Sequence, residues 1–151
     1  MTQHAPRVSI RRHAADGYRA LLALETSLAA GPVPKSTLEL IRLRVSQING
    51  CGFCVDMHAR DARRDGETDE RLATVAAWRE TPYFTDAERA ALALAEAATR
   101  IADRAEGVPQ DVWDEAARHY DEPALATLVM AIAAINAWNR INVTVRNLAG
   151  S

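Results

Sequence analysis

Apolar residues recur at intervals of three and four along most of this chain, and that spacing limits its fold more than any other feature. The sequence is rich in alanine, leucine, arginine and glutamate. Side chains three and four apart share one face of an α-helix, whereas a half-buried strand needs strict alternation. No segment of the 151 residues alternates convincingly, and no repeat of solenoid length stands out. The pattern therefore predicts an all-α protein.

Glycine, proline and capping residues divide this pattern into about seven helices. The expected ranges are 14–29, 36–48, 51–64, 68–78, 85–105, 112–120 and 121–148. Ser36 with Glu39, and Thr85 with Glu88, have the spacing of capping boxes. We expect a single helical domain over residues 1–151, a helical bundle with its core in residues 14–148 and a mobile N-terminal segment, 1–12.

Composition and charge exclude several classes of partner. The net charge is −2, and the basic cluster of Arg7, Arg11, Arg12 and His13 is interpreted as a solvated surface, so we expect no nucleic-acid partner. No apolar run follows the basic N-terminal residues, which argues against a secretory signal. The apolar stretch Leu125–Ile135 is shorter than a membrane span and predicts a buried helix. We expect a cytoplasmic protein with no membrane partner.

The two cysteines form the motif Cys51-x-x-Cys54-x-x-x-His58. On a helix the three side chains lie on one face, at successive turns. The Asn49-Gly50 break places both cysteines in the first turn, where unpaired N–H groups and the helix dipole stabilise a thiolate. Such a thiolate could attack a peroxide, and the second thiol could then close a disulfide. His58 is one turn from Cys54 and two turns from Cys51, which favours Cys54 as the attacking residue. We expect Cys51, nearer the helix start, to be more open to a reductant.

Glu39 stands twelve residues before Cys51 on the preceding predicted helix. Folded back at Asn49-Gly50, that helix would bring its carboxylate towards His58, where it could relay a proton. The same residue could instead serve only as the capping partner of Ser36. Cys51, Cys54, His58 and Glu39 could also bind zinc, although structural zinc sites mostly use two separate ligand pairs. A further alternative is that both cysteines are simply buried.

The spacing of Glu39, eleven residues, Cys51-x-x-Cys54, three residues, His58 resembles the signature of the alkylhydroperoxidase D-like / carboxymuconolactone decarboxylase family. The segments 78–92 and 135–142 are similar to the same group, so the resemblance extends from about Tyr18 to Arg146. The best-known members carry a histidine between the two cysteines, where this chain has Phe53. The decarboxylase branch lacks the cysteine pair, so decarboxylation is not expected.

The resemblance implies an alkylhydroperoxidase D-like helical fold and an oxidoreductase with peroxiredoxin-type thiol peroxidase activity. It assigns Cys54 as the peroxide-attacking cysteine, Cys51 as the resolving one, and Glu39 with His58 as the proton relay. The implied partners are a peroxide substrate, an external dithiol reductant and further copies of the chain in a homo-oligomer. No cofactor or metal is expected. The alternative is a helical oligomer that senses redox state or binds zinc without turnover.

Polar residues in the last predicted helix also require partners, because buried polar groups are almost always hydrogen-bonded. They are Asn136, Asn139, Arg140 and Asn142. The sequence leaves three readings open: a hydrogen-bond network between helices or subunits, an approach of Arg140 to the active site, or a solvated helix face. The other histidines, His4, His13 and His119, are interpreted as surface residues.

Overall fold

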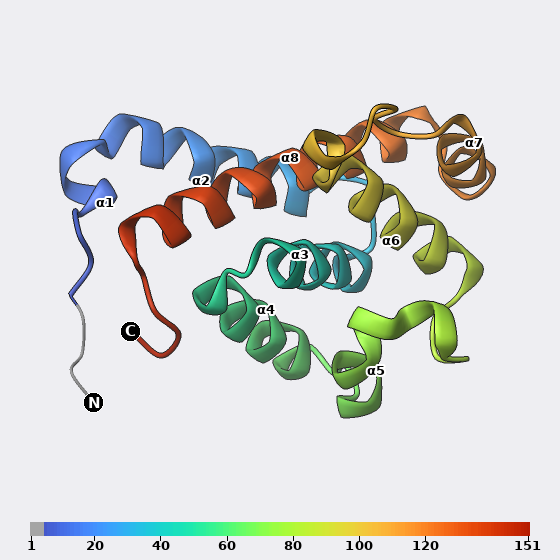
Figure 1. The fold of residues 1–151 in the computed structure, drawn as a ribbon, viewed down its shortest axis with the longest axis horizontal. Coiled ribbons are helices and arrows are strands. Elements are labelled where there is room, and N and C mark those ends of the chain that lie inside the picture. Colours follow the sequence, from blue (N-terminus) through green and yellow to red (C-terminus); the bar gives the residue numbers. More distant parts are fainter. Residues whose placement is uncertain (1–4) are drawn as a thin grey trace.

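The computed structural model describes residues 5–151, and all regular elements in that range are helices (Figure 1). The α-helices are α1 (Ile10–His13), α2 (Ala15–Ala29), α3 (Lys35–Asn49), α4 (Gly52–Arg64), α5 (Asp69–Thr74), α6 (Asp86–Thr99), α7 (Gln110–His119) and α8 (Glu122–Val145). Two 3-10 helices, η1 (Val75–Glu80) and η2 (Ile101–Asp103), follow α5 and α6. The all-α prediction is confirmed, with eight α-helices in this range where about seven were expected.

Several helix starts follow the predicted capping residues. Thr68 caps α5, Asp121 caps α8, and Thr85 with Glu88 forms a complete capping box at α6. Three predicted ends are wrong. The 68–78 helix divides into α5 and η1, the 85–105 helix ends at Thr99, and the last helix ends at Val145.

The capping box predicted for Ser36 and Glu39 is absent. Helix α3 begins one residue earlier, at Lys35, with Pro34 as its N-cap residue and no side-chain cap. Ser36 is therefore already inside the first turn, where its hydroxyl cannot occupy the N-cap position. Glu39 bonds elsewhere, to Arg42 and His58.

Helix α1 was not expected, and all of it but His13 falls in the segment 1–12 that was predicted to be mobile. The backbone N–H of Arg7 donates to the carbonyl of Val145 at 2.8 Å, next to the C-terminal end of α8. The mobility of residues 1–12 stays a prediction. Residues 1–4, and with them His4, lie outside the described residues.

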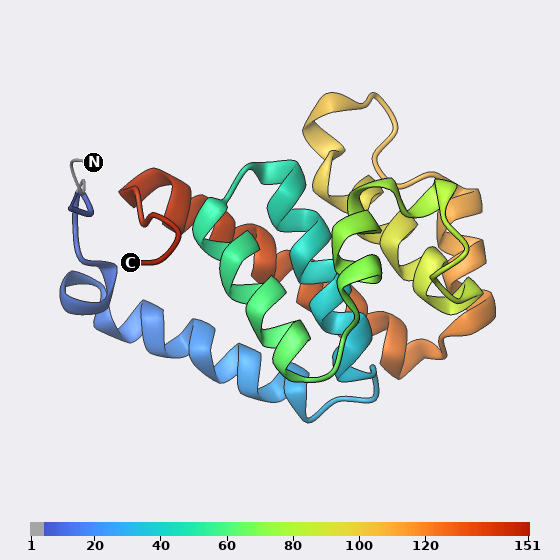
Figure 2. The ribbon, with the colours of Figure 1, turned by 90° about the horizontal axis from the view of Figure 1, so that it is seen from below.

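Helix α3 is the central element of the bundle, with α4, α6 and α8 packed around it (Figures 1 and 2). On one side, Leu38, Ile41 and Val45 join a large core shared with α6 and α8. On the other side, Leu40 and Leu43 join a second core shared with α4, α5 and η1. Because both of its sides are packed, α3 holds its polar side chains in fixed positions.

Helix α8 corrects the expectation drawn from its apolar stretch. That expectation considered Leu125–Ile135 alone, but the helix has 24 residues and is apolar well beyond that stretch. Among the helices of residues 5–151, α8 is the one whose length and composition would allow it to cross a membrane. In the structure it lies in the bundle, packed against α2, α3, α4, α6 and α7, and 44% of its most apolar window is buried.

The turn between α3 and α4 is a Schellman motif that sets the position of Cys51. The N–H of Cys51 donates to the carbonyl of Ser46, and the N–H of Gly50 donates to that of Gln47. Gly50 has a φ of 67°, a left-handed conformation that other residues adopt at a cost. The Asn49-Gly50 break was correctly predicted, and its geometry makes Cys51 the N-cap residue of α4.

Candidate functional site

Cys51 and Cys54 are joined by a disulfide at the start of α4. Cys51 is the N-cap residue, and its sulfur accepts a hydrogen bond from the backbone N–H of Cys54 at 3.3 Å. The helix start therefore acts directly on the sulfur of Cys51, although it was expected to serve both cysteines. Both residues are only 1% exposed. The expectation that Cys51 is the more accessible is thus wrong for the disulfide form.

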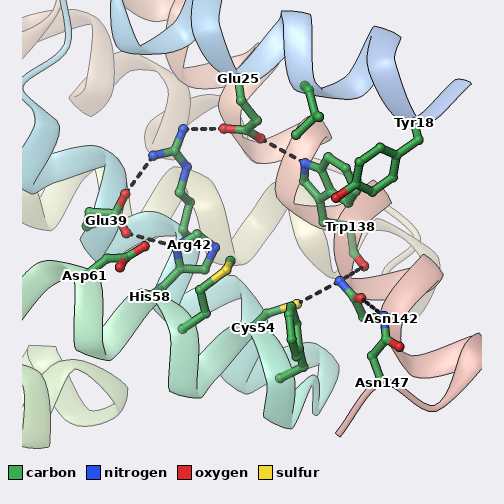
Figure 3. A pocket seen from close by; sticks show the side chains of 13 residues that line it. Tyr18, Glu25, Glu39, Arg42, Cys54, His58, Asp61, Trp138, Asn142 and Asn147 are labelled. Atoms are coloured by element: carbon green, nitrogen blue, oxygen red, sulfur yellow. Dashed lines mark hydrogen bonds and ion pairs between the residues drawn. The ribbon is translucent and has the colours of Figure 1, made fainter. Parts of the chain in front are cut away.

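A cavity of about 370 Å³ opens beside the sulfur of Cys54, between α2, α3, α4 and α8 (Figure 3). Cys54, His58 and Glu39 line it, whereas Cys51 does not. The lining is part aromatic and part charged. Phe53 is among its apolar members.

Glu39 and His58 form a buried pair, with Oε2 of Glu39 2.9 Å from Nδ1 of His58. Burial opposes ionisation of Glu39, but the hydrogen bond and charge of His58, together with Arg42, outweigh it, so the pKa of Glu39 lies below its ordinary value. An ionised carboxylate can only accept, so Nδ1 of His58 donates the hydrogen bond. In the neutral ring this leaves Nε2 free to accept a proton.

Arg42 extends this pair into a longer chain of charges. Its guanidinium donates to Oε1 of Glu39 at 2.8 Å and to Oε2 of Glu25, on α2, at 2.6 Å. The other oxygen of Glu25 accepts from the indole N–H of Trp138, on α8, at 3.0 Å. Figure 3 shows the chain running from His58 to Trp138 along one wall of the cavity. Arg42 holds Oε1 of Glu39, the carboxylate oxygen that does not contact His58.

The polar residues of α8 divide between two tasks. Asn136 and Asn139 both accept hydrogen bonds from Asn49, on α3, which matches the predicted network between helices. Asn142 lines the cavity and contacts the sulfur of Cys54. Arg140 is exposed, bonds back to Asn136 and does not line the cavity, so its suggested approach to the site is wrong.

The structure thus brings Glu39, His58 and Cys54 together around one cavity. Cys51 is bonded to Cys54 but does not line that cavity. Sequence reasoning missed Arg42, Glu25 and Trp138. A signal was present, because Glu25 interrupts the apolar face of its helix and Arg42 is three residues after Glu39. His13 is exposed, and His119 contacts Glu115 at the end of α7, away from the sulfur cavity.

The geometry does not favour the zinc alternative. Within residues 5–151, no group of three His, Cys, Asp or Glu side chains is placed to hold a metal ion. Both sulfurs are bonded to one another, and Nδ1 of His58 is engaged by Glu39.

The model of the carboxymuconolactone decarboxylase family matches residues 15–97, which include Glu39, both cysteines and His58. The chain belongs to the carboxymuconolactone decarboxylase family. Over 145 residues it is 40% identical to the uncharacterized protein YdfG of Bacillus subtilis, covering 96% of this chain and 97% of that protein.

A solved member of similar sequence comes from Agrobacterium tumefaciens. It superposes with a TM-score of 0.91 at 35% identity, over 97% of this chain and 99% of that one. It is described as a protein of unknown function, with the suggestion of an AhpD antioxidant defence protein. Among AhpD proteins themselves, the alkyl hydroperoxide reductase AhpD of Bradyrhizobium diazoefficiens is 50% identical over 42 residues, covering 28% of this chain and 23% of that protein. The alkylhydroperoxidase D-like fold of this family is therefore shown.

Proposed function

We propose that this family member is a thiol-dependent peroxidase that cycles the Cys51–Cys54 disulfide. The observation that carries the proposal is the common cavity of Cys54, His58 and Glu39, with a second cysteine bonded to the first. A nucleophile, a base and a group that orients the base are the parts that activated-cysteine chemistry requires. The short similarity to AhpD proteins supports the same reaction class.

In the first step, His58 takes the thiol proton of Cys54 at Nε2, directly or through one water. The thiolate attacks the oxygen of the hydroperoxide that carries hydrogen. As the S–O bond forms, the O–O bond breaks, and the leaving alkoxide or hydroxide takes the proton from His58. Cys54 is then a sulfenic acid and the peroxide has become an alcohol or water. Glu39 keeps the Nδ1–H of His58 in place throughout.

In the second step, the thiol of Cys51 attacks the sulfenic sulfur, which closes the disulfide and releases water. An external dithiol then attacks the sulfur of Cys51, and the thiolate of Cys54 leaves with the electron pair. A second attack within the mixed disulfide frees Cys51 and leaves the donor oxidised. Gly50 and Gly52, on either side of the buried Cys51, are exposed, and this turn is the side from which a reductant would approach.

The alternative is a redox sensor that is oxidised once and does not turn over. Peroxide consumption with an excess of a small dithiol separates the two functions. The proposal expects many equivalents of peroxide consumed per equivalent of wild-type protein, and none above background for Cys54→Ser. Consumption of one equivalent by wild type, after which the Cys51–Cys54 disulfide stays oxidised in the presence of the dithiol, would favour the sensor. Equal turnover in both proteins would contradict the role of Cys54.

A further inference from the structure

Asn142 reaches the sulfur of Cys54 from the far end of the chain. Its side-chain Nδ2 lies 3.5 Å from Sγ, and the two residues are 88 positions apart. Asn142 is 7% exposed, so its amide is shielded from water. In Figure 3 the amide of Asn142 lies on the α8 side of the cavity and points at the sulfur. A buried amide needs hydrogen-bond partners, because burying it unpaired would be unfavourable.

Two neighbours fix which atom of the Asn142 amide faces the sulfur. One atom lies 3.0 Å from the backbone carbonyl of Trp138, which can only accept, so that atom is the nitrogen. The other, the oxygen, accepts a hydrogen bond from Nδ2 of Asn147 at 2.7 Å. The nitrogen carries two hydrogens, and one remains for Cys54 after Trp138 has taken the other. The amide is therefore held as a donor towards the sulfur.

Donors to Cys54 are otherwise scarce. The backbone N–H groups at the start of a helix commonly stabilise a cysteine thiolate. Here the N–H of Cys54 itself donates to the sulfur of Cys51, so the helix start serves the other cysteine. Among the hydrogen bonds of the described residues, Asn142 supplies the one that Cys54 Sγ accepts.

The surrounding charges make such a donor more necessary. The titratable and charged groups that line the cavity are Tyr18 and Glu25 from α2, Glu39 and Arg42 from α3, and His58 and Asp61 from α4. Three of them are carboxylates, which disfavour a further negative charge. Arg42 bridges two of the carboxylates, so its charge is already partly balanced.

We propose that Asn142 is a catalytic residue that stabilises the thiolate of Cys54, with Asn147 as its positioning residue. The inference rests on the proposed function for its role in turnover. The thiolate arises twice in that cycle: before the attack on peroxide, and as the leaving group when the dithiol attacks Cys51. A neutral amide donor assists both steps without exchanging a proton, whereas His58 transfers one.

The test measures the ionisation of Cys54 without any peroxide. In the Cys51→Ser background, Cys54 is the single thiol of the chain, and its rate of alkylation by iodoacetamide reports the thiolate fraction. We expect Asn142→Ala to raise the pH midpoint of alkylation by about one unit. Asn147→Ala should raise it by less. Asn136→Ala, the matched control on the same helix, should leave the midpoint unchanged, because Asn136 does not line the cavity.

An unchanged midpoint in Asn142→Ala, with the helical circular dichroism of wild type, would overturn the inference. If that variant does not fold, Asn142→Asp keeps the volume but presents a carboxylate, and it should raise the midpoint still further; no rise would again overturn the inference. Two further outcomes distinguish the role of Asn142 from the proposed peroxidase function. A shifted midpoint in a protein that turns over no peroxide supports the thiolate role and contradicts the peroxidase. Normal turnover with an unchanged midpoint contradicts the role of Asn142 alone.

Discussion

The carboxylate of Glu39 accepts a hydrogen bond from Nδ1 of His58 at 2.9 Å, across nineteen positions of sequence and between two helices. Glu39 comes from the doubly packed α3, whereas His58 comes from α4, one turn after Cys54. The contact fixes the orientation of a histidine that lines the same cavity as Cys54. Because the pKa of Glu39 lies below its ordinary value, the carboxylate is ionised near neutral pH and holds that orientation there.

Arg42 is the residue whose loss should most disturb this arrangement. Arg42→Met leaves the carboxylates of Glu39 and Glu25 without their shared cation, and breaking a buried ion pair in this way costs about 3–5 kcal/mol. The matched control is Arg60→Met on α4, which breaks an exposed pair with Asp56 and should cost less than about 1 kcal/mol. Urea unfolding at neutral pH measures both. Equal, small losses would show that the Arg42 bridge adds nothing to stability.

A second prediction concerns the acid dependence of stability. Burial opposes ionisation of Glu96, but hydrogen bonds from Arg79, Arg44 and Trp78 outweigh it, so its pKa lies below the ordinary value of 4.5. A depressed pKa gives stability that is present above 4.5 and lost as the pH falls through the lower, folded-state value. Glu96→Gln should therefore be less stable than wild type at neutral pH, and this difference should shrink below pH 4.5. Urea unfolding across that range tests it, and a constant difference would contradict the assignment.

The helices, and the position of the Cys-x-x-Cys motif at a helix start, could be predicted because each depends on local spacing. The chain of contacts from His58 through Arg42 to Trp138 could not, because it joins residues of four helices, and their relative packing is not encoded in any one segment. The accessibility of Cys51 failed for a related reason. Closeness to a helix start says nothing about what packs over it, and the residue is 1% exposed. The capping role of Ser36 failed because Pro34 begins the helix earlier.

A third prediction is that the protein assembles into a homo-oligomer. Helix α8 presents Val129 and Met130, 44% and 47% exposed, on a face that the bundle does not cover. Neighbouring apolar side chains with this exposure favour association between copies of the chain. Light scattering at micromolar concentration should give a multiple of the 16.5 kDa chain mass, and Met130→Lys should reduce it. A wild-type mass of one chain would contradict the prediction.

The proposed peroxidase cycle depends on which cysteine meets the peroxide, and trapping the sulfenic acid tests this most directly. Cys51→Ser and Cys54→Ser are each reduced, treated with one equivalent of peroxide and labelled with a dimedone-type reagent, and the labelled residue is identified by mass spectrometry. We expect label on Cys54 in the Cys51→Ser protein, because Cys54 lines the cavity with His58 and Glu39. We expect no label in the Cys54→Ser protein. Label on Cys51 in the Cys54→Ser protein, with none on Cys54 in the other variant, would contradict this expectation.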